Sequence, residues 1–186
     1  MLNKILLIVS DKFHHFTAHK DVITKSQLYR LLNTDDVILP RSKKIRLMPG
    51  QGFNSNSIQQ LLTDISTSKN SQYFDYTLWQ NLPKRASKES THKYKDENIL
   101  ISDPKRMSKK EFTMHMLIDE ECEMMRDHQT GLHVQGMLLV EAARQAYLAT
   151  MESFYMENNK EKNYFIFNSL TINYNRFSFP LPSSIK

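Results

Sequence analysis

The 186-residue sequence predicts an α+β fold, in which a small α/β segment precedes a unit of antiparallel strands and one long helix. Short aliphatic runs and helical patterns follow one another in residues 1–83, as in small α/β segments. A period-two alternation then covers residues 111–119, and residues 136–156 have apolar positions at helical spacing. We therefore expect an α/β segment over residues 1–83, a solvated linker over residues 84–90 and a second unit over residues 91–186.

The α/β segment opens with residues 5–9, ILLIV, whose aliphatic and β-branched side chains favour a buried strand. Thr24 precedes a helical pattern and has Gln27 three residues later, the arrangement of a capping box at a helix start. Gly50 and Gly52 then interrupt the chain, and this pair predicts a turn rather than a phosphate-binding loop, because neither glycine-rich nucleotide-binding motif is present. The remaining elements, two strands and a helix, are expected at residues 37–39, 44–48 and 57–62.

The second unit is predicted to begin with a hairpin formed by residues 97–102 and 111–119. One long helix follows over residues 136–156, and residues 164–179, rich in aromatic and β-branched side chains, favour a long strand. The apolar positions of the helix are Met137, Val140, Ala143 or Ala146, Tyr147 and Met151.

A polar loop that contains histidine runs into Gly136 and the first turn of the long helix. Free N–H groups and the positive end of the helix dipole lie at such a start, and glycine lets a ligand approach the backbone closely. These properties suit the carbonyl of a thioester and the oxyanion formed when it is attacked. Glu141 and Arg144 lie one turn apart in an otherwise apolar stretch, so they are able to pair.

The segment DHQTGLHVQGMLLVEAARQA, residues 127–146, resembles the signature of the A-factor biosynthesis hotdog family, and THKYKDENILIS, residues 91–102, is similar to the start of that family's hotdog unit. The resemblance spans residues 91–182. It implies a hotdog fold, a long central helix wrapped by a curved antiparallel sheet. The implied activity is transfer of a β-ketoacyl group from an acyl carrier protein to the hydroxyl of dihydroxyacetone phosphate, in the biosynthesis of signalling molecules or secondary metabolites.

Carried over from the family, Glu141 and Arg144 correspond to its functional pair and Gly136 to its glycine at the helix start. Glu141 is then the candidate general base, whose pKa burial would raise unless Arg144 offsets this, and Arg144 is the candidate phosphate ligand. His133 and His128 are alternative proton carriers. For each of these residues a purely structural role remains open. Substrate contacts are expected at Gly136, His128, Gln135 and Gln145.

The sequence departs from the family in two ways. Family members carry two hotdog units, whereas residues 1–83 contain no second helix motif. A hotdog sheet needs about five strands, and only three are predicted here, so the hotdog unit is expected to be partial at its C-terminal end. The chain is then a fragment, completes its sheet with residues 1–83, or depends on dimerisation. The alternative functions are a dehydratase or thioesterase acting on acyl thioesters, or a non-catalytic acyl-binding or assembly module.

The distribution of charge along the chain indicates which kinds of partner it could bind. Residues 84–110 hold nine basic and four acidic residues, whereas residues 111–186 hold six and ten. The basic stretch is expected to contact an acidic acyl carrier protein, and a small phosphorylated acceptor and a homodimer are the other expected partners. It is formed by Lys84, Arg85, Lys93, Lys95, Lys105, Arg106, Lys109 and Lys110.

The sequence predicts no nucleic-acid partner, membrane span, cofactor or metal site. The basic stretch lacks a nucleic-acid motif, no apolar run is long enough to span a membrane, and no secretory signal follows residues 5–9, so a cytoplasmic protein is expected. No cofactor or metal is implied. The HHFTAH segment, residues 14–19, is expected to be an exposed loop. The single cysteine, Cys122, lies between two glutamates, which disfavour its thiolate.

Overall fold

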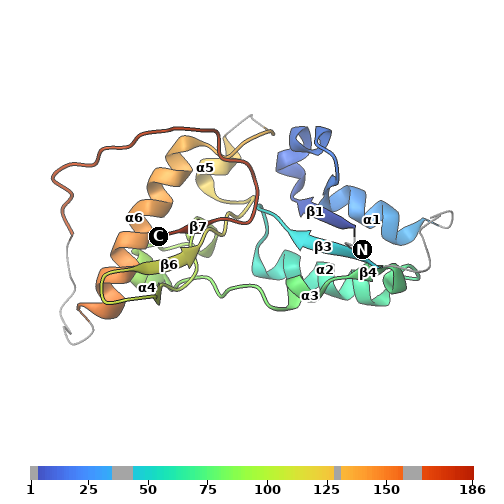
Figure 1. The fold of residues 1–186 in the computed structure, drawn as a ribbon, viewed down its shortest axis with the longest axis horizontal. Helices are drawn as coiled ribbons and strands as arrows, with labels where there is room; N and C mark the ends of the chain where they lie inside the picture. The colour runs from blue at the N-terminus through green and yellow to red at the C-terminus, as the bar shows by residue number, and fades with distance from the viewer. Residues whose placement is uncertain (1–3, 35–43, 128–130, 157–164) are drawn as a thin grey trace.

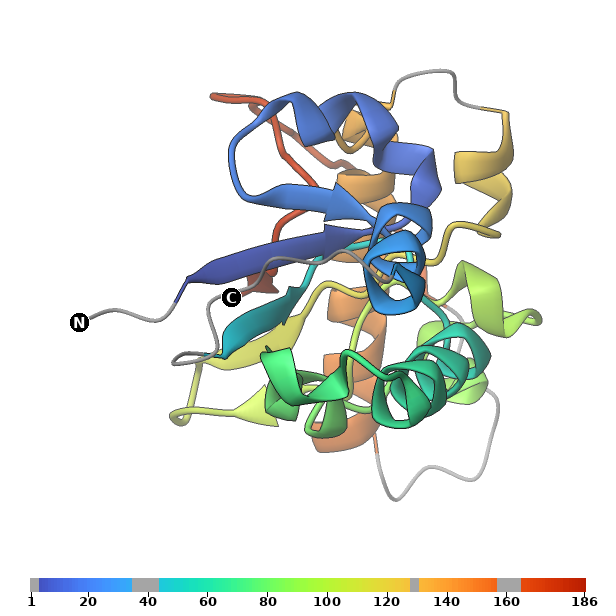
Figure 2. The same ribbon diagram turned by 90° about the vertical axis from the view of Figure 1, so that its right-hand side faces the viewer.

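A computed structural model describes residues 4–34, 44–127, 131–156 and 165–186, which form two parts that lie side by side (Figure 1). One part holds a four-stranded parallel sheet with its helices. The other holds a three-stranded antiparallel sheet beside one long helix. Figure 2 views the molecule from the side of the parallel sheet and shows the long helix behind it.

The parallel sheet has the strand order β2-β1-β3-β4 and confirms the predicted α/β segment. The predicted strand at residues 5–9 is the central strand of this sheet, and the one predicted at residues 44–48 is its neighbour β3. The strand expected at residues 37–39 lies outside the described residues. The four strands are β1 (Ile5–Val9), β2 (Val22–Thr24), β3 (Ile45–Pro49) and β4 (Phe74–Asp75).

Capped helices cover the parallel sheet. At the start of α1 (Lys25–Asn33), the Thr24 side chain accepts a hydrogen bond from the Gln27 N–H, and the Gln27 side chain accepts one from the Thr24 N–H, which confirms the capping box. Asn54 forms the same arrangement with Ser57 before α2 (Ser55–Thr67). Leucine and isoleucine side chains on these helices pack with strands β1 and β3 and with Trp79 of α3 (Thr77–Gln80) in one buried cluster.

The antiparallel sheet has the strand order β5-β6-β7. Met114 of the strand β6 (Phe112–His115) is buried together with Met116 and Ile118, which follow the strand, as the alternation predicted. Its hairpin partner is β5 (Lys105–Arg106), however, and residues 97–102 contribute only bridges, such as that between Ile101 and Met116. Its other neighbour, β7 (Ser184–Ile185), comes from beyond the predicted strands. Residues described within 1–83 form their own sheet and add no strand to this one.

The long helix α6 (Gly136–Phe154) confirms the prediction for residues 136–156 within two residues. The buried face of this helix differs from the apolar positions that the sequence predicted. Leu138, Ala142, Gln145 and Ala149 are buried, whereas the predicted Met137 and Tyr147 are exposed. The first turns carry apolar side chains on every side, so their spacing could not identify the packed face.

The long strand predicted at residues 164–179 is wrong for the residues described. Tyr164 lies outside them, and residues 165–179 form only an isolated bridge between Ser178 and Val134. Figure 1 shows this segment running back past α6 and turning between the two parts before it reaches β7. A run of residues that favours strands forms one only beside a partner strand, and the described residues 165–179 pair with none of the strands β5, β6 and β7.

The glycine turn after β3 joins the two parts. The backbone N–H groups of Gly50 and Gln51 donate to the carbonyls of Ile8 and Pro180, and those of Gly52 and Phe53 donate to Ile118. In parallel sheets of this kind, ligands bind at the carboxyl ends of the strands. Here carbonyls of the chain itself accept from the N–H groups of residues 50–53 at that edge. Gly52 has φ 99°, and a Cβ there would lie 2.1 Å from Ser10 Oγ.

Residues 84–90 are less solvated than expected for a linker. Ala86 is buried, and the Arg85 guanidinium donates to the carbonyls of Ile99, Leu117 and Phe53. Burial lowers the pKa of Arg85. Leu7, Val9, Phe13 and Phe16 of the N-terminal part also share one buried cluster with the antiparallel part. The division at residues 83 and 91 stays a prediction.

The remaining short elements lie between these strands and helices along the chain. They are η1 (Asp11–Ala18), η2 (Ser71–Tyr73), α4 (Lys88–Thr91), η3 (Asp96–Asn98) and α5 (Glu123–Arg126).

Candidate functional site

The candidate site begins at the first turn of α6. Gln135 is the N-cap residue, but its side chain does not cap the helix and instead donates from Nε2 to the Met124 carbonyl at 2.7 Å. The first N–H groups of a helix have no partner within the helix. With the N-cap side chain turned away, the start of α6 keeps donors available for a ligand that reaches Gly136.

A cavity of about 720 Å³ lies at this helix start. One wall is the start of α6 with the two residues before it, and the other is a stretch of the C-terminal segment. Among the described residues that line the cavity there is no carboxylate, and Arg176 is the permanently charged side chain. The lining residues are His133, Val134, Gln135, Gly136, Met137, Leu139, Tyr174, Asn175, Arg176, Phe177 and Ser178.

Gly136 lets the two walls approach each other closely. A Cβ added at this position would lie 2.9 Å from both Cζ and the hydroxyl oxygen of Tyr174. The Tyr174 phenol therefore lies directly over the helix start. The His133 ring is 5.2 Å from that of Phe177, centroid to centroid, so an imidazole and two aromatic rings surround the same opening.

The far wall is held in place where it leaves the cavity. The Val134 N–H donates to the Ser178 carbonyl at 2.7 Å, and the ring of Phe179 stacks on that of Phe16 with centroids 5.3 Å apart. Gln51, from the glycine turn, donates from Nε2 to the Leu181 carbonyl at 3.1 Å. The parallel part thus fixes the chain that closes the cavity.

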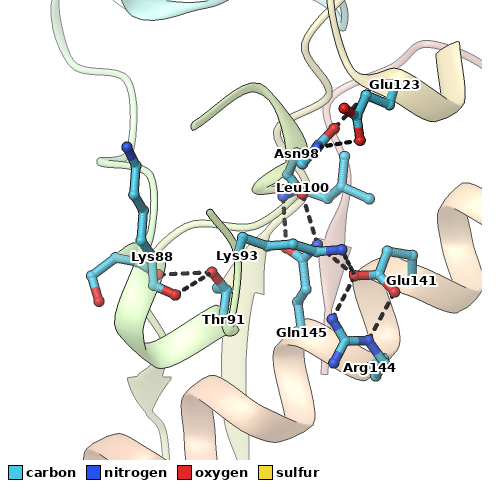
Figure 3. A network of polar contacts seen from close by, with 10 residues as sticks. Lys88, Thr91, Lys93, Asn98, Leu100, Glu123, Glu141, Arg144 and Gln145 are labelled. Carbon is cyan, nitrogen blue, oxygen red and sulfur yellow. Dashed lines mark hydrogen bonds and ion pairs between the residues drawn. The ribbon is translucent and has the colours of Figure 1, made fainter. Parts of the chain in front are cut away.

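A second group of polar residues lies farther along α6 (Figure 3). Arg144 donates from Nε and Nη2 to the two carboxylate oxygens of Glu141, both at 2.8 Å, and Lys93 Nζ lies 2.7 Å from Glu141 Oε1. Gln145 is fully buried, accepts from the Leu100 N–H and donates to the Asn98 carbonyl and to Glu141. This group fastens α6 to residues 98–100.

The charge state of Glu141 follows from these contacts. Burial acts to raise its pKa, but hydrogen bonds from Arg144, Lys93 and Gln145 outweigh burial and lower the pKa to about 2. The ion pair in turn raises the pKa of Arg144. A carboxylate with so low a pKa is a weak base at neutral pH. The sequence left open whether Arg144 would offset the effect of burial on the pKa of Glu141. In the structure the hydrogen bonds have the larger effect.

The structure brings some predicted site residues together and separates others. His133, Gln135 and Gly136 line the cavity, whereas Glu141, Arg144 and Gln145 do not. Glu141 follows Gly136 by five residues, which places it about 140° around the helix axis at 3.6 residues per turn. One helix therefore presents two faces with different contacts. His128 lies outside the described residues.

Half of the residues of the predicted basic stretch make contacts within the molecule. Arg85 is half-buried and donates to backbone carbonyls, Lys93 pairs with Glu141, and Lys95 pairs with Glu123. The Arg106 guanidinium carbon lies 4.8 Å from the ring centre of Phe154, the last residue of α6. The β5–β6 hairpin is thus at the opposite end of the helix, about 27 Å from Gly136, and does not flank the cavity.

The sequence did not predict Tyr174 or Arg176 as site residues, and it assigned Lys93 to the basic stretch rather than to Glu141. Arg176 was the basic residue in a run otherwise interpreted as a strand, and Lys93 lies in the segment that resembled the start of the family's hotdog unit. Their contacts depend on long-range packing. Residues 174–178 approach the start of α6, and α4 docks against the same helix.

The other candidate sites lie elsewhere among the described residues. These residues contain no group of three or more His, Cys, Asp or Glu side chains that could hold a metal ion. His14, His15 and His19 of the HHFTAH segment are exposed, as expected, although the segment forms η1 rather than a loop. Burial raises the pKa of the Cys122 thiol, which disfavours its thiolate. No helix in the described residues is long and apolar enough to cross a membrane.

Comparison with known protein families shows which family this chain belongs to. The family model of the A-factor biosynthesis hotdog domain matches residues 75–178, more than half of the sequence. The chain belongs to this family. The matched region starts before the predicted linker and includes Arg85, α6 and the cavity wall as far as Ser178. Searches of curated proteins and of solved structures found no match.

Membership of the A-factor biosynthesis hotdog family supports the hotdog fold, and the mixed α and β content agrees with the predicted α+β class. The helix motif predicted to carry the resemblance lies inside the matched region and supplies the near wall of the cavity.

Proposed function

We propose that the chain transfers a β-ketoacyl group from an acyl carrier protein to the hydroxyl of an acceptor such as dihydroxyacetone phosphate. The observation that carries this proposal is the cavity at Gly136, which lies on the helix motif of an A-factor biosynthesis hotdog domain. Val134, Met137 and Leu139 give it an apolar wall suited to an acyl chain.

In the proposed reaction the thioester carbonyl lies against the first turn of α6. The acceptor oxygen attacks the carbonyl carbon while the His133 imidazole takes the hydroxyl proton. N–H groups at the helix start stabilise the oxyanion. The oxyanion then collapses to the carbonyl of the new ester as the C–S bond breaks, and the leaving thiolate receives the proton from His133. No oxidant or reductant is needed.

Glu141, Arg144 and Gln145 take a positioning role in this proposal. Their hydrogen bonds hold α6 against residues 98–100 and so fix the direction in which Gly136 faces the cavity. The low pKa of Glu141 supports this role over that of general base. It also favours a second candidate function, a hotdog module that binds acyl thioesters without converting them.

A homodimer remains part of the proposal. Several large apolar side chains exposed on α6 and on the C-terminal segment support it, because exposed apolar surface is typical of interaction sites. They include Met137, Tyr147, Ile166, Leu170 and Phe177.

The test is ester formation from β-ketoacyl carrier protein and dihydroxyacetone phosphate, followed by mass spectrometry. We expect His133→Gln to slow the reaction by about 100-fold, the usual share of a general base. His115→Gln serves as the control, because His115 is exposed on β6 and lies outside the cavity lining.

Equal rates for wild type and His133→Gln would rule out the proposed base. Tight binding of the acyl carrier protein with no product would select the acyl-binding module. Release of a free acid or an enoyl product without acceptor would select a thioesterase or dehydratase.

A further inference from the structure

Arg176 is the cation nearest to the proposed reaction. It lines the cavity together with Gly136 and Tyr174, and its side chain is exposed. None of the ion pairs among the described residues involves Arg176. The described lining residues include no carboxylate that would compete for its guanidinium.

Arg144, the phosphate ligand expected from the family resemblance, is placed differently. Two of its nitrogens are bound to Glu141 at 2.8 Å, and it does not line the cavity. Binding a phosphate through Arg144 would break this bidentate pair and leave Glu141 with Lys93 and Gln145 alone. Charge-assisted bidentate pairs are among the stronger hydrogen bonds in proteins, so this exchange is unfavourable.

We infer that Arg176, and not Arg144, binds the phosphate group of the acceptor. The inference rests on the proposed function, since it is that reaction which requires a phosphorylated acceptor. The planar guanidinium fork of Arg176 matches the geometry of phosphate oxygens. The positive end of the α6 dipole faces the same cavity and adds to the attraction.

With Arg176 on one wall, the cavity has an apolar side and a charged side. Apolar side chains of Val134, Met137 and Leu139 lie on the helix side, and the cation lies on the opposite wall. A β-ketoacyl chain along the helix and a phosphate on the C-terminal segment would bring the acceptor hydroxyl between them, beside His133. The C-terminal segment thereby selects the acceptor.

The test measures binding and turnover separately. Isothermal titration with dihydroxyacetone phosphate, without acyl donor, is expected to show affinity lowered roughly tenfold or more in Arg176→Gln. Arg176→Lys should recover part of the loss, because it keeps the charge without the fork. Arg126→Gln is the matched control, since Arg126 is an exposed arginine paired with Glu121 outside the cavity lining. Dihydroxyacetone without phosphate should bind wild type and Arg176→Gln equally.

Unchanged affinity in Arg176→Gln, or the loss appearing in Arg144→Gln with the fold intact by circular dichroism, would overturn the inference. The outcomes for the proposed function are distinct. If phosphate binding depends on Arg176 but no ester forms, the inference stands and the transfer reaction fails. If ester forms and Arg176→Gln leaves the KM for dihydroxyacetone phosphate unchanged, the reaction stands and the inference fails.

Discussion

Gln51→Ala is expected to lower the free energy of unfolding by about 4 kcal/mol, since it leaves several buried backbone groups without partners. Gln51 is 5% exposed. Its Nε2 donates to the carbonyls of Met116 at 3.0 Å and Leu181 at 3.1 Å, and its Oε1 accepts from the Ile118 N–H at 2.8 Å. One side chain thus joins the glycine turn of the parallel part to both chain segments that face it.

Chemical denaturation measures this effect, with Gln60→Ala as the control. Gln60 is an exposed glutamine on α2 whose amide donates only to Asp64, at 2.9 Å, so its loss should cost less than about 0.5 kcal/mol. Gln51→Glu keeps the shape of the side chain but sets a carboxylate against two carbonyls, so it should destabilise at least as much as alanine. A Gln51→Ala protein as stable as Gln60→Ala would contradict the docking of the two parts through this residue.

The second large effect is a loss of stability in acid that depends on Glu141. The folded pKa of Glu141 is about 2, below the ordinary value of a glutamate, so the unfolded chain binds the proton first as the pH falls. The stabilisation is therefore complete above the unfolded pKa and is lost as the pH falls from about 5 to about 2. It amounts to roughly 3 kcal/mol.

The measurement is the free energy of unfolding at a series of pH values for wild type and Glu141→Gln. The variant should be less stable at neutral pH, and the two curves should converge near pH 2 because the protonated glutamate and the glutamine carry the same charge. Glu121→Gln is the control, since its pair with Arg126 is exposed and contributes less than about 1 kcal/mol. Parallel curves for wild type and Glu141→Gln would contradict the contacts in Figure 3.

Local signals predicted much of the fold. The strand at residues 5–9, the capping box at Thr24 and the helix from Gly136 each depend on side chains within one turn or one strand of each other. The strand expected at residues 164–179 failed because strand formation also requires a partner strand, which a local pattern does not supply. The strand that pairs with β6 on this side is instead formed by Ser184 and Ile185, which no local pattern marked.

The site was predictable only where it follows the helix motif. Gly136, Gln135 and His133 meet at the cavity because they are neighbours in sequence. Glu141 was assigned to the same site, although helix geometry alone turns it away from Gly136. Arg176 joins the site from more than 30 residues away in sequence, through the bridge between Val134 and Ser178, and such a contact leaves no trace in residue spacing.

The cavity at Gly136 is the central claim, and methyl NMR of the ¹³C-methionine-labelled chain with a non-hydrolysable β-ketoacyl pantetheine tests it most directly. Met137 lines the cavity, whereas Met107 is exposed at the distant hairpin. We predict that the Met137 methyl signal shifts on titration and that the Met107 signal does not. A shift at Met107 with Met137 unchanged would place the acyl ligand elsewhere and contradict the account.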